Sequence, residues 1–361
     1  FHPSGNFYKY HSGSPTDDEY YSGVLSILSH LTCITEEKNL EISNLISMNK
    51  PVISEDFNPK SRNPSLILDW NENLLREFAN DETLIALDAD LKFDTGTYGV
   101  ADRYPERYIQ CGIAEQDMVS IAGTLALSGF KPIVHSFASF LTNRSAEQIF
   151  NNLTENSQIL YMGFLAGILP SAPGHSHQAV NDVGIIASSC GISIYEPSCK
   201  TELEYCFSKA LKEIKNTYIR IGSVDYPDSL EKTKENNNLN PRITGTDIAI
   251  ITSGPSMTKI ALEVANLSPT RISVYTRPQI NIEFTKEEIL EITKYKGVIV
   301  LENYLPALAT YYYLREKLYG LDIAIKRVGV NSIPKNGQTL EVLAIHGMDS
   351  QSIHKAALSL M

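Results

Sequence analysis

Residues 109–129 read Ile-Gln-Cys-Gly-Ile-Ala-Glu-Gln-Asp-Met-Val-Ser-Ile-Ala-Gly-Thr-Leu-Ala-Leu-Ser-Gly. The carboxylate of Glu115 stands at the start of a run that is mostly small and apolar. The apolar positions recur at helical spacing, which predicts a helix with a buried face: Ala114, Met118, Ile121, Ala122 and Leu125. A carboxylate at the mouth of a buried helix costs free energy unless a partner hydrogen-bonds it. Glu115 is therefore either a ligand-binding group or an acidic residue that the helix dipole favours in the first turn.

Composition narrows the class of protein. The chain has 361 residues, enough for two or three domains that each bury a core. Its formal net charge of −11 argues against a nucleic-acid partner, which usually requires a basic face. No run approaches the roughly 18 apolar residues that a membrane helix needs. The five cysteines show neither metal-binding spacing nor disulfide density, which predicts reduced thiols in a cytoplasmic protein.

The order of apolar and polar stretches predicts two α/β domains. Residues 1–63 are polar and contain many Pro, Ser and Asn residues. Residues 64–228 alternate apolar, strand-like runs with helical segments, which predicts a doubly wound, mostly parallel sheet covered by helices on both faces. Residues 229–242 are too polar to bury and are expected to be a linker. Residues 243–361 repeat the alternation in a smaller α/β domain.

The stretch around Glu115 resembles the Gly-Ile-Ala-Glu-Gln signature of the pyrimidine-binding domain of transketolase-like enzymes, which use thiamine diphosphate. The two α/β stretches follow the order of the last two domains of that family, so 243–361 is expected to resemble the transketolase C-terminal domain. Residues 10–19 resemble the His-Gly-Ala-Pro segment that closes the family's preceding, diphosphate-binding domain. The resemblance makes 1–63 the tail of such a domain and implies a catalytic position for His11, beside the diphosphate and the substrate.

The resemblance also assigns residues to the cofactor. It implies that Glu115 contacts N1′ of the aminopyrimidine ring as the activating catalytic group, with Ile113 beside it in the cofactor site. Burial in general raises the pKa of a carboxyl group and lets it share a proton at neutral pH. Asp90 follows a predicted strand and resembles the strand end that lines the family's cofactor pocket. A plain loop cap would explain Asp90 equally well.

Residues 135–144 follow a predicted strand, open a helix and resemble the family segment whose aromatic rings stack on the cofactor. The resemblance assigns Phe137 and Phe140 to that platform. Their i, i+3 spacing places them on one side of a helix, although two phenylalanines at this spacing are also typical of a core. Arg144 resembles the arginine of the family's Arg-x-x-(Asp/Glu)-Gln pattern, which supports the site and subunit contacts.

Residues 174–178, Gly-His-Ser-His-Gln, resemble the family's Gly-Pro-Thr-His-Gln loop. There the histidine hydrogen-bonds oxygens of the donor substrate, which implies a catalytic role for His177 and a substrate contact for His175. An imidazole that titrates near neutrality can polarise a carbonyl and shuttle its proton. Two histidines at i, i+2 could instead be metal ligands, but no Cys, Asp or Glu partner stands at zinc spacing. We therefore expect no metal ligand in this chain.

Two departures from the family concern the substrate. Arg220 occupies the first position of an Arg-x-x-Arg pattern that grips sugar phosphate in transketolases, but Ser223 replaces the second arginine. Pro173 stands where the family has an aspartate that contacts the donor. Serine cannot reproduce a bidentate guanidinium–phosphate contact. We expect Arg220 to contact a small, sugar-derived carbonyl substrate, with an acceptor that is unphosphorylated, nucleotide-linked or otherwise modified.

The chain lacks the Gly-Asp-Gly motif and following Asn with which the family holds its metal and diphosphate. A diphosphate needs a divalent ion and backbone donors, so thiamine diphosphate and Mg or Ca are expected to be held there by a diphosphate-binding partner half. Phe1 is not an initiator Met, so we expect that half to be either a separate chain or a removed N-terminal part. Such sites lie across a subunit interface, which predicts a dimer of heterodimers.

Together these features favour a thiamine-diphosphate-dependent, transketolase-like enzyme that transfers a two-carbon ketol or acyl unit to a carbonyl acceptor, with this chain supplying the pyrimidine half of the site. Two alternatives stay open. One is the β component of a 2-oxo acid dehydrogenase-type enzyme, which shares this architecture. The other is a catalytically silent interaction subunit, which the altered substrate groups would fit, because a fold does not imply a function.

Overall fold

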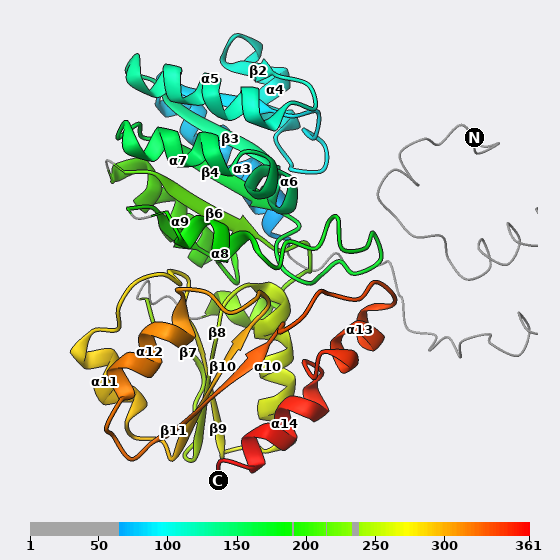
Figure 1. Ribbon diagram of the computed structural model, residues 1–361, viewed down its shortest axis with the longest axis vertical. Coiled ribbons are helices and arrows are strands. Elements are labelled where there is room, and N and C mark those ends of the chain that lie inside the picture. Colours follow the sequence, from blue (N-terminus) through cyan, green and yellow to red (C-terminus); the bar gives the residue numbers. More distant parts are fainter. Residues whose placement is uncertain (1–64, 190, 214, 233–237) are drawn as a thin grey trace, which may run out of the picture. The chain divides into compact units, whose positions relative to one another are not determined.

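The structure is a computed structural model that describes residues 65–361 apart from 190, 214 and 233–237 (Figure 1). His11, together with the whole of the stretch 1–63, lies outside the described residues. The described residues form two sheets, each with its own helices, in the order that the sequence predicts. The predicted α/β class, with a mostly parallel sheet followed by a smaller α/β domain, is confirmed.

Six parallel strands form the first sheet, in the order β2-β1-β3-β4-β6-β5. In chain order they are β1 (Leu84–Asp88), β2 (Tyr108–Gln110), β3 (Lys131–Phe137), β4 (Leu160–Phe164), β5 (Ser193–Tyr195) and β6 (Thr217–Ile221). Strands of a parallel sheet are buried on both faces and appear as continuous apolar runs, so β1, β4 and β6 are evident in the sequence. The edge strands β2 and β5 span three residues each, too few to form such a run.

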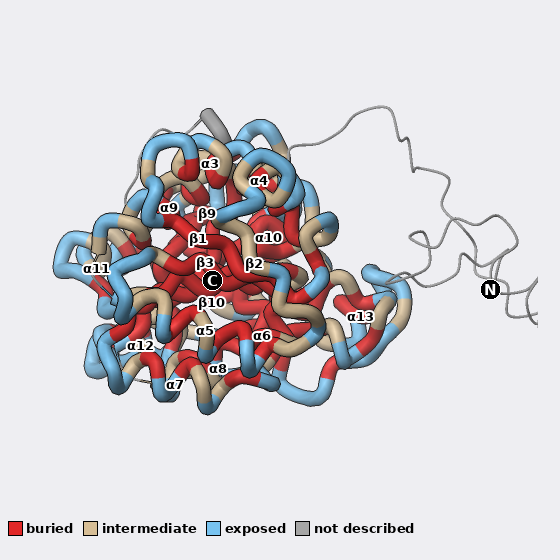
Figure 2. The backbone as a smooth tube through the Cα atoms, turned by 90° about the horizontal axis from the view of Figure 1, so that it is seen from above, coloured by how far each residue is buried: buried red, intermediate tan, exposed pale blue. Residues whose placement is uncertain are grey.

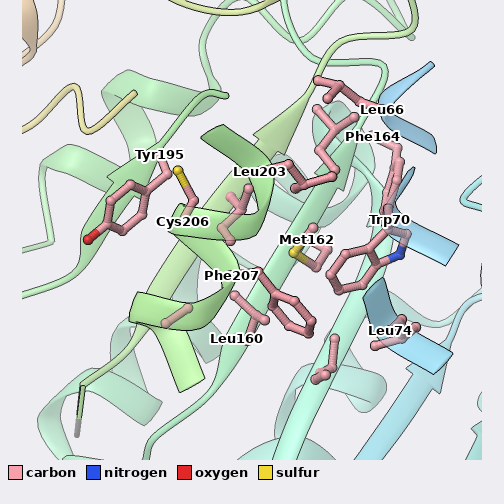
Figure 3. Close-up of a cluster of buried hydrophobic side chains, with 14 of the residues drawn as sticks. Leu66, Trp70, Leu74, Leu160, Met162, Phe164, Tyr195, Leu203, Cys206 and Phe207 are labelled. Carbon is pink, nitrogen blue, oxygen red and sulfur yellow. The ribbon is translucent and has the colours of Figure 1, made fainter. Parts of the chain in front are cut away.

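Helices cover both faces of the first sheet. They are α3 (Leu66–Asn80), α4 (Tyr98–Arg103), α5 (Glu115–Leu127), α6 (Ala138–Arg144), α7 (Ala146–Thr154), α8 (Asp182–Ala187) and α9 (Lys200–Lys212), with a 3₁₀ turn η2 (Pro105–Arg107) before β2. On one face, Trp70 of α3 packs edge-on against Phe207 of α9, with ring centroids 4.9 Å apart (Figure 3). On the other face, Met118 of α5 and Ile149 of α7 join an apolar cluster with residues of β1 and β3.

The second sheet has five strands in the order β11-β10-β8-β9-β7. They are β7 (Asn240–Ile243), β8 (Ile248–Thr252), β9 (Ile272–Thr276), β10 (Gly297–Glu302) and β11 (Ala324–Gly329), and the helices that follow them are α10 (Pro255–Leu267), α11 (Lys286–Ile292), α12 (Thr310–Leu318), α13 (Thr339–Ile345) and α14 (Ser350–Leu358). Figure 2 shows strands in the buried interior and the outer turns of helices such as α11 exposed. Among the described helices, none has the length and apolarity needed to cross a bilayer.

The first strand of the second sheet lies inside the stretch 229–242 that the sequence predicts as a linker. After the 3₁₀ turn η3 (Asp228–Lys232), strand β7 begins at Asn240 and pairs antiparallel with β9. Its polar sequence, Asn-Pro-Arg-Ile, suits an edge strand, where a proline does not interrupt a ladder on both sides. The second sheet therefore begins three residues before the predicted boundary.

The guanidinium of Arg220, on β6, is fully buried, and each of its three nitrogens contacts oxygen acceptors within the protein. Nε and Nη2 donate to the two oxygens of Asp182 at 2.9 and 3.0 Å, and Nη2 also donates to the backbone oxygen of Ala179 at 3.2 Å. Nη1 reaches Oδ1 of Asn303, after β10, at 2.7 Å and Oε1 of Glu196 at 2.9 Å. These contacts are all internal to the protein, and the expected substrate contact of Arg220 stays a prediction. Arg220 joins residues that belong to the first α/β domain to Asn303, which follows a strand of the second sheet.

We expect the substitution Arg220→Ala to lower the free energy of unfolding by about 3–5 kcal/mol, because it leaves Asp182 and Glu196 buried without their cation. Urea denaturation of the purified chain measures this loss. Lys317→Ala serves as the control, since it breaks an exposed ion pair with Glu283 and should cost less than about 1 kcal/mol. A wild-type unfolding midpoint for the Arg220 variant would contradict the structural role and favour the substrate role.

A second buried polar group lies within β3, two residues before its end. His135 is fully buried, and its Nδ1 lies 3.0 Å from Oγ1 of Thr95 and 3.6 Å from Oδ1 of Asp88. Oγ1 of Thr95 donates its own hydrogen to the carbonyl of Leu91 at 2.9 Å, so the Nδ1–H of His135 is the donor toward Thr95. Burial lowers the pKa of His135 to about 4, although the nearby Asp88 acts in the opposite direction. The imidazole is therefore neutral throughout the physiological pH range.

This shift predicts a pH dependence of stability. Between pH 6.5 and pH 4 the unfolded chain gains a proton on His135 that the folded chain does not. The free energy of unfolding therefore decreases by about 3 kcal/mol as the pH is lowered from 6.5 to 4. Above pH 6.5 the residue contributes no pH dependence. Urea midpoints measured from pH 7 to pH 4 for the wild type and His135→Asn should diverge, with the flatter curve in the variant. Parallel curves would show that His135 titrates normally in the folded state.

Candidate active site

Glu115 is the first residue of α5, and only 4% of its surface is exposed. The helix begins after a turn in which Gly112 has a φ of +70°, a left-handed conformation that favours glycine. Oε1 of Glu115 accepts a hydrogen bond from Nη1 of Arg144, the last residue of α6, at 2.6 Å. The buried carboxylate thus has a cationic partner from another helix, while 44% of the Arg144 side chain remains exposed.

Aromatic rings continue from this ion pair toward the predicted histidine. The guanidinium of Arg144 lies over the ring of Phe140, 4.1 Å from its centroid. Phe140 lies 5.5 Å from Phe137, centroid to centroid, and 5.1 Å from the ring of His177 in an edge-to-face arrangement. Phe137 is also 5.7 Å from His177. The structure therefore brings Glu115, both phenylalanines and His177 into one continuous group of side chains.

The loop that carries His177 is held by hydrogen bonds on both sides of the histidine. Near the histidine, Oγ of Ser139 in α6 donates to the carbonyl of Ser176 at 2.9 Å. Further along, Nε2 of Gln178 donates to the carbonyl of Lys335, which follows β11, at 3.1 Å. His177 is therefore placed by contacts from both sheets. His175 lies on the same loop and is exposed.

Two other predicted cofactor residues flank Glu115. Ile113, 74% exposed, lines a hollow of about 490 Å³ together with Ala114, Glu115, Gln116, Asp117 and Arg144. Asp90 is exposed and follows β1 with a φ of +63°. Its N–H donates to Oε1 of Gln110 at 3.0 Å, and the same oxygen accepts the N–H of Gly112 at 2.9 Å. Asp90 therefore lies beside the turn that leads to Glu115.

Two features of this site were not predicted from the sequence. The sequence placed Arg144 among supporting residues, but its ion pair with Glu115 and its stacking on Phe140 emerge only from the structure; the i, i+4 spacing of Phe140 and Arg144 on one helix was the available signal. Nothing in the sequence indicated the role of Gln110, because its partners Asp88 and Asp90 come close only when β1 and β2 pair.

Within the described residues, no group of three or more His, Cys, Asp or Glu side chains is arranged to hold a metal.

Comparison with known proteins agrees with this arrangement. The transketolase pyrimidine-binding domain family matches residues 69–227. A protein of Methanocaldococcus jannaschii described as a transketolase C-terminal section is 27% identical over 305 residues, which make up 81% of this chain and 95% of that protein. A subunit of the apulose-4-phosphate transketolase of Phocaeicola vulgatus is 23% identical over 299 residues, or 80% of this chain and 95% of that subunit.

The fold has the same relatives. The solved structure of a split-gene transketolase, an inactive β4 tetramer, matches this chain with a TM-score of 0.70 at 22% identity, over 83% of this chain and 98% of that one. The sequence matches agree with the family resemblance expected from the sequence, and the likeness of fold agrees with the order of the two sheets. The chain is similar to the transketolase-like, thiamine-diphosphate-dependent proteins: residues 69–227 match their pyrimidine-binding domain, and the similarity to a transketolase C-terminal section extends over most of the chain.

Proposed function

We propose that this chain supplies the pyrimidine-binding half of an enzyme that transfers a two-carbon ketol unit to a carbonyl acceptor. The position of the Arg144 guanidinium carries the proposal. This flat group of N–H donors lies on the ring of Phe140 and hydrogen-bonds the buried carboxylate of Glu115. An aminopyrimidine ring is also flat, and its ring nitrogen seeks a carboxyl group. The residues present therefore fit the pyrimidine half of thiamine diphosphate.

Each residue of the site has a role in this proposal. Thiamine diphosphate, when bound, supplies a nucleophilic carbon for the ketol transfer. Glu115 would hydrogen-bond N1′ of its ring, and Phe140 would provide an aromatic face, with Phe137 packed behind it. Asp90 and Ile113 would line the same pocket. His177, at the edge of the aromatic pair, would hydrogen-bond an oxygen of the donor and exchange a proton with it.

We also propose a partner half that holds the diphosphate and its Mg or Ca ion, as a separate chain or as a part preceding this sequence. The M. jannaschii and P. vulgatus relatives support this proposal, because this chain spans 95% of each, and one is named as a section and the other as a subunit. A dimer of heterodimers would complete two such sites. Among the described residues, Cys111 and Cys206 form no disulfide, which supports a location in the reducing cytoplasm.

The substrate is proposed to be a small, sugar-derived carbonyl compound whose acceptor is not gripped by a guanidinium from β6. The internal contacts of Arg220 support this proposal, since its guanidinium is buried and paired with the carboxylates of Asp182 and Glu196. His175, exposed on the loop of His177, is the proposed polar contact in its place.

The substitution Glu115→Ala tests the proposed function. In the chain assembled with its diphosphate-binding half, thiamine diphosphate and Mg²⁺, we expect ketol transfer to fall by about 10²–10⁴-fold, because the group that activates the cofactor is lost. Glu287→Ala is a matched control, since Glu287 also stands in the first turn of a helix, but exposed and on α11. Wild-type turnover in a folded Glu115 variant would refute the proposal.

A second experiment tests whether the Arg144 guanidinium occupies the place of the pyrimidine ring. We expect Arg144→Ala to bind 4-amino-2,5-dimethylpyrimidine about tenfold more tightly than the wild type, because the ring no longer has to displace the guanidinium from Glu115 and Phe140. Titration of the full chain followed by NMR measures both affinities. Arg76→Ala, which removes a similarly exposed arginine on α3, should leave the affinity unchanged. Weaker binding to the Arg144 variant would instead identify Arg144 as a contact of the ring.

A further inference from the structure

We propose that Gln110 and Asp88 are positioning residues that together fix the turn leading to Glu115. The inference rests on the proposed function, because it concerns how Glu115 is held for its cofactor. Gln110 is the last residue of β2 and Asp88 the last residue of β1, so the two neighbouring strands end side by side. Neither residue lines the hollow beside Glu115, and both act on that residue through the backbone.

The carboxamide oxygen of Gln110 connects two turns. It accepts the N–H of Asp90 at 3.0 Å and the N–H of Gly112 at 2.9 Å. Asp90 and Gly112 both have positive φ, +63° and +70°, a left-handed conformation that is found mainly in turns and favours Gly, Asn and Asp. One side-chain acceptor therefore satisfies the backbone of both turns at the points where they leave the sheet.

Asp88 dictates which way the carboxamide of Gln110 faces. Oδ2 of Asp88 accepts a hydrogen bond from Nε2 of Gln110 at 2.7 Å, and Oδ1 accepts the N–H of Leu91 at 2.9 Å. Asp88 is fully buried, and a carboxylate only accepts hydrogen bonds. The NH₂ group of Gln110 must therefore face Asp88, and its oxygen must face the two backbone N–H groups. A flipped carboxamide would place donors against donors on one side and acceptors against each other on the other.

This arrangement reaches Glu115 through three residues. The carbonyl of Gly112 accepts the N–H of Ala114 at 2.8 Å, and Ala114 is the N-cap of α5. A shift of Gly112 would move the start of the helix and with it the Glu115 carboxylate. Because a misplacement of about 1 Å can cost a factor of about 100 in rate, a fixed turn is a requirement of the proposed site.

The hydrogen bond between Gln110 and Asp88 can be tested by exchanging the amide and the carboxylate between the two positions. Gln110→Glu places a carboxylate against Asp88 and should release both turns. The double variant Gln110→Glu/Asp88→Asn restores the pattern. The amide introduced at position 88 can donate to one oxygen of the carboxylate introduced at position 110, while the other oxygen accepts the two N–H groups. Gln110→Ala removes the contacts without introducing charge, and serves if Gln110→Glu does not fold.

Hydrogen exchange of the amides of Asp90 and Gly112, measured by NMR on the full chain, reports on the turns without cofactor. We expect exchange to accelerate at least about tenfold in Gln110→Glu and Gln110→Ala, and to return to within about threefold of wild type in the double variant. In the protein assembled with its diphosphate-binding half, kcat should fall about tenfold and the Kd of thiamine diphosphate should rise, while KM for the donor stays constant. The double variant should recover both.

The outcomes separate this inference from the proposed function. Faster exchange with unchanged kcat and cofactor affinity would overturn the positioning role and leave the proposed function intact. Unchanged exchange in Gln110→Ala, or a double variant no better than Gln110→Glu, would overturn the paired arrangement itself. Wild-type turnover in Glu115→Ala would refute the proposed function, whatever the exchange rates of the two amides are.

Discussion

The buried carboxylate of Glu115 is the constraint on which the site depends. A charged group with 4% exposure needs a hydrogen-bond partner, and in this structure the partner is Arg144 at the end of α6. That contact places α6 across the start of α5, and α6 also carries Phe140 under the guanidinium. The same helix holds the His177 loop through Ser139. Satisfying one carboxylate thus assembles most of the polar and aromatic groups of the site.

The second constraint is the connection between the two sheets. Arg220 is surrounded by Asp182, Glu196 and Asn303, so each nitrogen of this buried cation has an oxygen acceptor within the protein. Replacement of such a network by apolar residues often leaves the free energy of unfolding unchanged. The network therefore acts mainly on geometry, because it fixes where Asn303, the residue after β10, contacts the first α/β domain. The loop of His177 spans the same boundary through Gln178. The position of His177 therefore depends on contacts from elements that accompany both sheets.

Features that depend on neighbouring residues in the chain could be predicted from the sequence, and features that depend on distant residues could not. Continuous apolar runs are local, so β1, β4, β6 and β8 were evident, and Glu115 was evident because a carboxylate is anomalous at the start of an apolar helix. The edge strands β2, β5 and β7 are short or polar and were missed. The internal contacts of Arg220 could not be predicted, because Asp182 and Asn303 are distant from it in the chain. The two hydrogen bonds accepted by the Gln110 side chain could not be predicted either, because its oxygen binds backbone N–H groups on two separate turns.

The topology explains why these groups gather at one edge. In the order β2-β1-β3, the chain leaves β1 toward one side, to β2, and then crosses to the other side, to β3. Ligands of doubly wound sheets bind where the strand order reverses, beyond the carboxyl ends of the strands. Asp88, Gln110 and Phe137 are the last residues of these three strands. Glu115 follows the end of β2 by five residues, and Phe140 follows the end of β3 by three. The reversal in strand order, together with the turn at Gly112, therefore brings an acidic group and an aromatic ring to the same edge of the sheet.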